Sequence, residues 1–421
     1  MELNKFLLIG MLATAFVACS SDDDNGDTSE PETKNEAPTP YVFVNAEGNS
    51  TVSFSGQTTR LKQGAEILKD FTTFGTTEVT IDTKFTDGTG FTDATLNNGK
   101  KIKNKVAEAV KSSVDQAAIR ATFDGYIEDQ VNTLLSKYTD IDAVPTAEKG
   151  VAGKLGKRLV TAKGLELNQA FNKGLIGALT LDQIVNDYLG LTEGAKVQED
   201  NTNGVKVEGK PYTNAEHFWD EAYGYLYGAS DADVLVNPNS RHLETVVDKF
   251  LYKYVQRVES DRDFKGIADR IFKAFKTGRE AIVSKDYTES KKQADIIRKE
   301  LSNVIGIRAV YYLKQGAKKI NDKGVIALND GSAFHDLSEG YGFVYSLQFT
   351  NNPATGAPYF TKAEVDGFIA TLDAGNGFWD LADDTAKLDA MATTIASEFS
   401  FSVAQAKSLN SIAQTIWEQK K

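Results

Sequence analysis

The sequence predicts a mainly α-helical protein in which two pseudo-symmetric helical bundles follow a short N-terminal extended segment. Apolar residues recur at helical spacing along most of the chain, strand signals are few beyond the N-terminal segment, and eight prolines in 421 residues leave room for long helices. The idea of two halves comes from a motif that occurs twice, beginning at His217 and at His335. We therefore expect one helical half over residues 41–230 and a second over residues 231–421.

The N-terminus predicts a lipoprotein signal. Lys5 precedes an apolar stretch, residues 6–17, that is too short to span a bilayer and has the proportions of a signal peptide. Ala18 and Cys19 follow, and a small residue before a cysteine resembles a bacterial lipobox, whose cysteine is acylated. We predict a signal peptide over residues 1–18 and a lipid anchor on Cys19; an ordinary secretory signal is the alternative. Because Cys19 is the only cysteine, disulfides and thiolate metal sites are excluded.

Residues 19–40 are the predicted tether between this lipid and the folded body. The acidic run Ser20–Asp24 resembles the export signal that sends lipoproteins of Bacteroidetes-type bacteria to the outer face of the outer membrane, although a solvated tether is the alternative. From Asn25 to Pro40 the chain is rich in Glu, Thr, Pro and Asn, a composition that buries too little apolar surface to fold. We expect a protein anchored in outer-membrane lipid that faces the cell exterior.

The body is predicted element by element from hydrophobic spacing and capping signals. In chain order we expect an extended or hairpin segment over 41–54, a helix over 60–71, a long loop over 72–98, a helical stretch over 102–135 with a break near 122–124, and a helical stretch over 147–173 bent by glycines. Helix starts are expected at Thr180 and Asn214, which carry N-cap side chains. Further helices are expected over 243–258, 267–283, 286–319, 333–349, 361–372 and 386–417.

The repeated motif places the same polar pair on two predicted helices. The segment HFWDEAYGYLY, residues 217–227, reappears as HDLSEGYGFVY, residues 335–345, with His, Glu, Tyr, Gly and the final Tyr in register. His, Glu and Gly fall at i, i+4 and i+7, which is one stripe of an α-helix. An imidazole and a carboxylate one turn apart can share a metal ion or pair with each other. A glycine inside a helix costs about 1 kcal/mol relative to alanine, and close approach of another helix or of a ligand is the usual reason for it.

These patterns give the candidate site. The candidate metal- or ligand-binding residues are His217, Glu221, His335 and Glu339, and the candidate pocket-lining residues are Tyr223, Gly224, Tyr227, Tyr341, Gly342 and Tyr345. No catalytic residue is assigned. The alternative for each His–Glu pair is a hydrogen-bonded pair at the edge of a core.

Composition narrows the class of partner. Hydrophobic residues are 41% and charged residues 25%, which is typical of a globular protein. A net charge of −12 without a concentrated basic face argues against nucleic acid. No second long apolar segment is present, so the lipid on Cys19 is the expected membrane attachment.

Taken with the duplication and the lipobox, the motif resembles that of the imelysin-like proteins, and more closely that of the surface lipoproteins of unknown function from gut Bacteroidetes in that group. The matching stretches are His217–Gly228 and, more weakly, Gly174–Ala178. In the family a glycine precedes the histidine and the glutamate follows after three residues; here the interval is four, and Glu216 replaces the glycine. The resemblance implies a helical two-bundle fold and metal or haem handling at a bacterial envelope.

The first functional hypothesis is therefore a cell-surface lipoprotein that binds a metal, a haem or a metal-bearing ligand in iron acquisition, with iron, zinc or haem as candidate cofactors and an envelope transporter as a candidate partner. Imidazole and carboxylate suit iron or zinc, and phenolate oxygen suits ferric iron. The alternative is a carbohydrate- or protein-binding surface module with a structural motif. A metal-dependent hydrolase is a third reading, although no peptidase or nucleotide motif is present.

Overall fold

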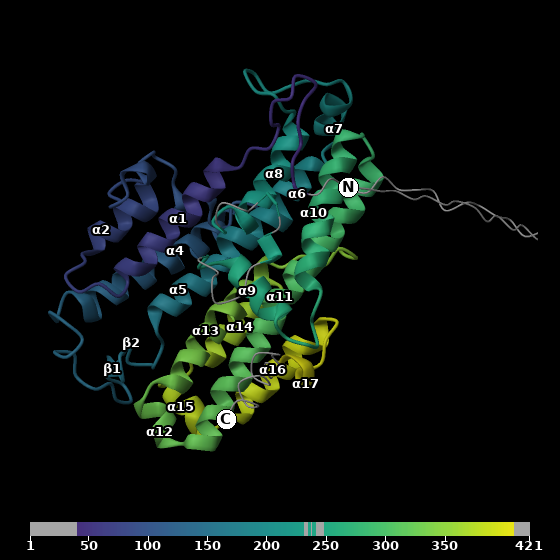
Figure 1. Ribbon diagram of the computed structural model, residues 1–421. Coiled ribbons are helices and arrows are strands. Elements are labelled where there is room, and N and C mark those ends of the chain that lie inside the picture. Colours follow the sequence, from purple (N-terminus) through teal and green to yellow (C-terminus); the bar gives the residue numbers. More distant parts are fainter. Residues whose placement is uncertain (1–39, 231–234, 237, 241–247, 408–421) are drawn as a thin grey trace, which may run out of the picture. The chain divides into compact units, whose positions relative to one another are not determined.

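Helical periodicity is realised along most of the chain. The computed structural model describes residues 40–230, 235, 236, 238–240 and 248–407. The chain separates into a unit over residues 1–36 and a unit over residues 37–421, and every described residue belongs to the second. The prediction of a mainly α-helical protein is confirmed (Figure 1). None of the described helices is long and apolar enough to cross a membrane.

The α-helices of the described chain are α1 (Ser55–Asp70), α2 (Glu78–Asp82), α3 (Ile102–Lys105), α4 (Ser113–Gln130), α5 (Leu167–Leu175), α6 (Leu189–Thr192), α7 (Ala195–Thr202), α8 (Asn214–Tyr227), α9 (Leu251–Glu259), α10 (Ile267–Val283), α11 (Tyr287–Lys323), α12 (Val325–Asn329), α13 (Ser332–Ser346), α14 (Lys362–Leu372), α15 (Phe378–Asp383), α16 (Ala386–Glu398) and α17 (Val403–Ala406). π-Helical segments are η1 (Thr83–Asp87), η3 (Val131–Leu135), η4 (Ile176–Leu181) and η5 (Gln183–Tyr188), and 3₁₀ turns are η2 (Ala94–Leu96), η6 (Pro238–Ser240) and η8 (Leu347–Phe349).

The two strands form a hairpin where the sequence predicts a helical stretch. β1 (Gly153–Leu155) pairs antiparallel with β2 (Arg158–Val160). Gly156, in the turn, has a φ of +58°, a left-handed conformation that glycine adopts without strain. The predicted helix over 147–173 is therefore wrong before α5, because the glycines in this stretch serve a turn rather than a bend.

Four further features differ from the prediction. The stretch over 72–98 contains α2, η1 and η2, so it is not only a loop. The break in the stretch over 102–135 lies between α3 and α4, where Ala107 has a φ of +53° and its N–H donates to the carbonyl of Ala178. Thr180 begins no helix; its hydroxyl donates to the Ile176 carbonyl within a continuous helical run. Thr213, not Asn214, caps α8, with Glu216 completing a capping box.

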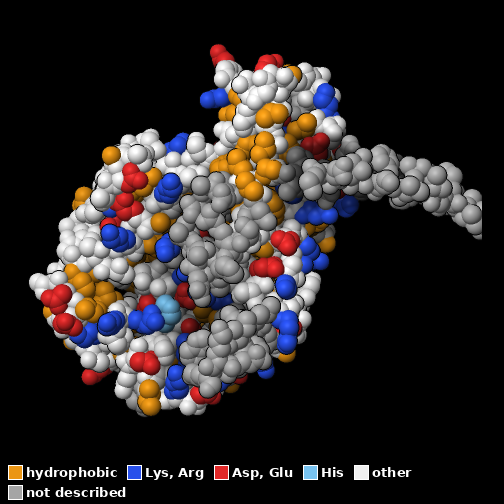
Figure 2. Space-filling view, viewed as in Figure 1, with side chains coloured by type: hydrophobic (Ala, Val, Ile, Leu, Met, Phe, Trp, Pro, Cys, Tyr) orange, Lys and Arg blue, Asp and Glu red, His pale blue; other side chains and the backbone are white. Residues whose placement is uncertain are grey.

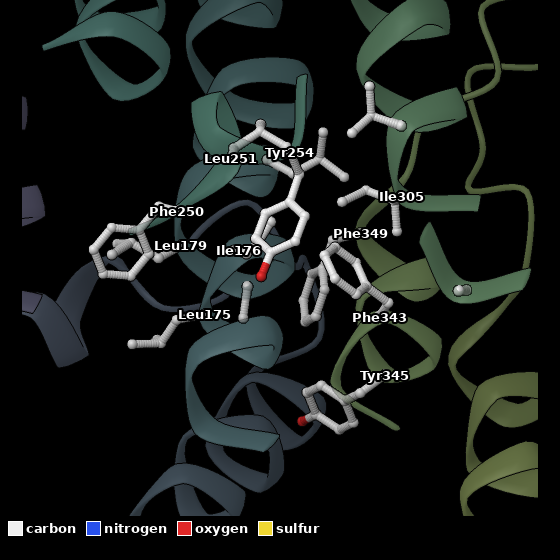
Figure 3. Close-up of a cluster of buried hydrophobic side chains, with 14 of the residues drawn as sticks. Leu175, Ile176, Leu179, Phe250, Leu251, Tyr254, Ile305, Phe343, Tyr345 and Phe349 are labelled. Atoms are coloured by element: carbon white, nitrogen blue, oxygen red, sulfur yellow. The ribbon is translucent and has the colours of Figure 1, made fainter. Parts of the chain in front are cut away.

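The core forms around α11 and α13. Helix α11 packs against α10, α13 and α16, and α13 also packs against α5 and α14. Figure 3 shows buried side chains from η4, α9, α11 and α13 meeting around the ring of Tyr254. Tyr254 makes an edge contact with Phe343, with ring centroids 4.8 Å apart. Because these helices supply apolar stripes to one interior, they hold α13 at its centre.

A buried arginine fixes the first motif helix. Arg279 of α10 is fully buried; its Nε donates to Asp220 at 3.0 Å and its Nη1 donates to Glu216 at 3.1 Å. Its Nη2 donates to the Thr51 hydroxyl at 3.0 Å, and the Tyr41 hydroxyl donates to Asp220 at 2.7 Å. The predicted extended segment over 41–54, confirmed by an antiparallel bridge between residues 44 and 50, is thus tied to α8 and α10.

The packing crosses the predicted boundary after residue 230. Helix α8 of the first predicted half packs against α10 of the second, and α13 of the second packs against α5 of the first. Residues 37–421 cluster as one compact unit. The pseudo-symmetry of two bundles therefore stays a prediction.

The motif glycines allow close approach of neighbouring segments, as the sequence suggests. A Cβ added at Gly224 would lie 2.3 Å from Cβ of Phe54, just before α1. A Cβ added at Gly342 would lie 2.4 Å from Cβ of Lys173 in α5. Both distances are shorter than real carbon contacts, so neither glycine has room for a side chain.

Replacement of Gly342 by alanine should lower the free energy of unfolding. The added methyl group meets α5 near its backbone, and overpacking of this kind costs about 1–3 kcal/mol. Urea denaturation of the variant and the wild-type chain measures the change.

Gly367→Ala is the matched control, because Gly367 lies inside α14 and has nothing within 4 Å of an added Cβ. There alanine should stabilise the protein by up to about 1 kcal/mol. Equal effects at both positions would contradict the close-approach explanation.

Candidate functional site

Both motif copies are helical, as predicted, and each lines a separate cavity. His217 and Glu221 lie on α8 and line a cavity of about 610 Å³, the His217 cavity. His335 and Glu339 lie on α13 and line a cavity of about 630 Å³, the His335 cavity. The structure therefore does not bring the four predicted ligand residues into one site.

His335 is held by a buried carboxylate and an arginine. Its Nδ1 lies 3.0 Å from Oε1 of Glu166 and 2.6 Å from Nη1 of Arg158. Arginine can only donate, so a neutral His335 that accepts from Arg158 at Nδ1 carries its hydrogen on Nε2. A neutral His335 with its hydrogen on Nδ1 instead donates to Glu166, and its Nε2 can then accept a hydrogen bond or bind a metal. A protonated His335 donates from Nδ1 to Glu166 and carries a hydrogen on Nε2 as well.

Glu339 pairs with a buried lysine of α5. Nζ of Lys173 lies 2.8 Å from Oε1 of Glu339, and the Tyr254 hydroxyl donates to the same oxygen at 3.2 Å. Burial opposes ionisation, but the charges of Lys173 and His335 and hydrogen bonds from Lys173 and Tyr312 outweigh it, and they hold the pKa of Glu339 well below its ordinary value. Glu339 is therefore a carboxylate that neutralises Lys173.

The His335 cavity carries a large excess of positive charge. Its lysines and arginines are Lys69, Lys173, Lys249, Lys253, Arg257, Arg308 and Lys319, whereas its acids are Asp336 and Glu339. Lys173 and Lys319 have a carboxylate within 4.0 Å; the other five have none among the residues that the structure describes. Figure 2 shows a histidine next to lysine or arginine side chains on the face in view, with acidic side chains close by. This concentration of cations contrasts with the net charge of −12 for the whole chain.

Arg308 is the most unusual of these cations. It is 1% exposed, and no carboxylate lies within 4.0 Å of it in the described part of the chain. Its Nε and Nη2 have no hydrogen-bond partner there, and neither does Nε of Arg257. The guanidinium carbon lies 4.1 Å from the ring centroid of Tyr311 and 4.4 Å from that of Tyr312. Cation–π contacts of this kind contribute about 0.5–2 kcal/mol, which is less than the cost of burying an unpaired charge.

A neighbouring lysine feels the same cations. Burial first, and then the charges of Lys173 and Arg257, lower the pKa of Lys253 to about 8. Glu339 raises it, but not enough to restore the ordinary value. The positive charges around this cavity therefore repel one another.

The His217 cavity is built differently. Nε2 of His217 lies 3.8 Å from Oε1 of Glu221, which accepts a hydrogen bond of 2.7 Å from Gln57. The imidazole stacks on Tyr212, with ring centroids 4.6 Å apart. Its buried Nδ1 has no partner among the described residues. The bland alternative, a polar pair at the edge of a core, describes part of this geometry, but the pair also faces a cavity.

The motif tyrosines lie in the core, and none of them lines either of these two cavities. Tyr223 stacks on Tyr41 with ring centroids 3.9 Å apart, and Tyr227 is buried against aromatic rings of α10. Tyr341 donates to Asp373 at 3.0 Å, and Tyr345 makes an edge contact with Phe123. Gly224 and Gly342 contact protein, as described above, so their place is in helix packing.

The side chains that could bind a metal ion are not clustered in the described part of the chain. Among the described residues, no group of three or more His, Cys, Asp or Glu side chains could hold a metal ion. Cys19 and the tether over 19–39 lie outside the described residues, and so does most of the region over 231–247.

Residues 38–402 match the family described as a domain of unknown function (DUF4856). The chain belongs to this family. The DUF4856 domain contains both motif helices and both cavities. No curated protein and no solved structure matches the chain.

The sequence analysis missed the cations of the DUF4856 domain. Arg308 sits between apolar residues of α11, and Lys173 sits between Phe171 and Leu175 in α5. A charged residue within a buried stripe was the available signal, because such residues are seldom buried without a partner. Glu166 lies between the apolar residues Leu165 and Leu167, but nothing in the local sequence identifies His335 as its partner.

Replacement of Glu339 by glutamine should destabilise the protein by about 3 kcal/mol at neutral pH, because it leaves the buried Lys173 without a carboxylate. The folded pKa of Glu339 is depressed, so its contribution is present above the ordinary value of 4.5 and is lost as pH falls below it. The difference between variant and wild type should therefore shrink in acid. Urea denaturation at neutral and acid pH measures both effects.

Glu300→Gln is the control for this prediction. Glu300 pairs with Arg270 at 2.7 Å, but Arg270 is half exposed. Loss of that pair should cost about 0–1 kcal/mol. A similar loss in both variants would show that burial of the Lys173–Glu339 pair does not matter.

Proposed function

We propose that this protein binds a small hydrophilic polyanion in the His335 cavity. The observation that carries the proposal is Arg308, a buried guanidinium with no carboxylate within 4.0 Å among the described residues. Taking an ion out of water costs several kcal/mol unless a counter-ion is supplied. An anionic ligand supplies it, and the planar fork of arginine suits phosphate and carboxylate groups.

The rest of the cavity wall supports a hydrophilic ligand. Only Ala65 and Leu68 have wholly aliphatic side chains, whereas the amides of Asn168, Gln169, Asn172 and Gln315 can meet hydroxyl groups. Nε2 of His335 adds another hydrogen-bonding atom. A volume of about 630 Å³ lies within the usual range for ligand sites, about 300–1,000 Å³.

A metal-bearing ligand is the second candidate, and it follows from the motif. His335 and Glu339 line the same cavity as the cations, so an anionic iron chelate, or haem through its two carboxylates, would meet these positive charges. The described residues offer no group of three ligands to a bare ion, so the metal would arrive within the anion. The resemblance to imelysin-like proteins supports a role in iron acquisition.

We also propose the location that the N-terminal sequence indicates. Acylated Cys19 would anchor the protein in outer-membrane lipid, with the DUF4856 domain at the cell exterior. There it would capture its ligand and deliver it to an envelope transporter.

Replacement of Arg308 by methionine should separate binding from stability. Tripolyphosphate is a suitable probe, and its affinity should fall about 10- to 100-fold, as expected for a lost charge-assisted hydrogen bond. Without ligand the variant should be as stable as the wild type or more stable, because an unpaired buried charge is removed. Isothermal titration calorimetry and thermal unfolding measure the two effects.

Lys292→Met is the matched control on the same helix. Lys292 is exposed and lines neither cavity, so its removal should leave both quantities unchanged. Lys253→Met is a second test, at another residue of the cavity wall, and it should also lower the affinity for tripolyphosphate. Equal affinity of all these proteins would overturn the proposal.

Polyanion affinity should fall as pH rises through the pKa of Lys253, about 8. The charged amine binds the anion, so above this pH the protein must take up a proton to bind. Affinity should drop about tenfold between about pH 7 and about pH 9.5, and Lys253→Met should flatten this dependence. A profile that is unchanged in Lys253→Met would show that another group is responsible.

The metal-bearing ligand has its own test. Ferric citrate and haem should bind more tightly than citrate alone, and His335→Ala should remove that preference while tripolyphosphate still binds. Elemental analysis of protein purified without a metal-affinity tag should then find iron. If ferric citrate and citrate bind alike in both proteins, the iron hypothesis is wrong, although polyanion binding stands.

A further inference from the structure

The His217 cavity is lined by side chains of both charges. Its wall comes from the start of α1, the loop before α3, the end of η5, the loop before α8, and α8 itself. The cations are Arg60, Lys100, Lys105 and Lys210, and the acids are Glu108, Asp187 and Glu221. Unlike the His335 cavity, the two signs nearly balance.

Two of the cations, Arg60 and Lys100, flank the same glycine. A Cβ added at Gly56 would lie 3.4 Å from Nζ of Lys100 and 3.7 Å from Nη1 of Arg60. Neither cation has a carboxylate within 4.0 Å in the described ranges, and the buried Nε of Arg60 has no hydrogen-bond partner there. Two adjacent like charges without a counter-ion favour a bound anionic group.

Among the acids, Asp187 has no salt bridge or hydrogen bond within the described chain. Burial, and then the neighbouring charges of Glu108 and Glu221, raise its pKa above the ordinary value, although the charge of Lys105 opposes them. Lys105 is already paired with Glu108. A positively charged ligand group would relieve the repulsion that Asp187 experiences.

Aromatic rings complete the wall. Tyr188 and Phe218 have ring centroids 6.4 Å apart, and His217 stacks on Tyr212. The buried Nδ1 of His217 offers a further unused hydrogen-bonding atom. Aliphatic or aromatic groups of a ligand can pack on these rings while its charged groups meet the cations and the acids of the wall.

We propose that the His217 cavity binds a zwitterion with a free carboxylate and a free ammonium group, an amino acid or a short peptide. The carboxylate meets Arg60 and Lys100, and the ammonium meets Asp187 and Glu221. The volume of about 610 Å³ exceeds what one small amino acid fills, so a short peptide fits better than a single residue. This site is independent of the polyanion site.

Isothermal titration calorimetry of the full-length chain with alanine, trialanine, N-acetyl-trialanine and trialanine amide tests the proposal. Trialanine should bind more tightly than alanine, and blocking either end should weaken it about tenfold, the loss expected for one charged hydrogen bond. Alanine binding as tightly as trialanine would identify a single amino acid as the ligand.

Two variants assign the ends. Asp187→Asn should lower the affinity for trialanine about tenfold but change the affinity for N-acetyl-trialanine little, because the acetylated end carries no charge. Lys100→Gln should lower the affinity for trialanine but change the affinity for trialanine amide little. Lys253→Met, in the other cavity, should leave trialanine binding unchanged while it weakens tripolyphosphate, so the two proposals fail separately.

Three results would overturn the zwitterion site: no binding of any probe, equal binding of free and blocked peptides, or Mn²⁺ binding that Asp187→Asn abolishes while no peptide binds. Mn²⁺ binding of this kind would show that the acids of the cavity form a cation site instead.

Discussion

The close contact between α5 and α13 is the constraint on which the candidate site depends. Gly342 has no side chain, so the backbone of α5 approaches α13 at Lys173. That approach places Lys173 against Glu339 and Glu166 against His335. Neither pair is local in sequence, and both are more buried than exposed. The second motif copy therefore holds α5 and α13 together, and it also forms part of a cavity wall.

The charge of the His335 cavity is opposite in sign to the net charge of the chain. The protein is acidic overall, yet one cavity gathers seven cations, and a buried arginine among them has aromatic rings beside it but no carboxylate among the described residues. A low-dielectric wall strengthens such a field and raises the local concentration of anions. Another buried arginine, Arg279, is paired with two carboxylates and holds α8 in place. The contrast between the two arginines separates a structural role from a ligand-binding one.

Much of the helical fold could be predicted from the sequence, because long amphipathic stripes and N-caps are local. The predicted bounds of α10 are confirmed, and Thr361 begins α14 as its N-cap, at the predicted start. The prediction failed where glycines had two meanings: Gly156 turns a hairpin, whereas Gly342 admits a neighbouring helix. Spacing alone could not distinguish a left-handed turn from a helical close contact, because that depends on what lies opposite.

By itself the sequence determined the helical class, the repeated His–Glu pair and the helical stripe that this pair shares with a glycine, since periodicity fixes which residues share a stripe. Only the tertiary structure decided that the two pairs line different cavities and that the motif tyrosines lie in the core. It also decided which cations gather around His335, because Arg308, Lys253 and Lys173 come from three different helices. The physical reason is that charge clustering is a property of packing, whereas stripes are a property of one helix.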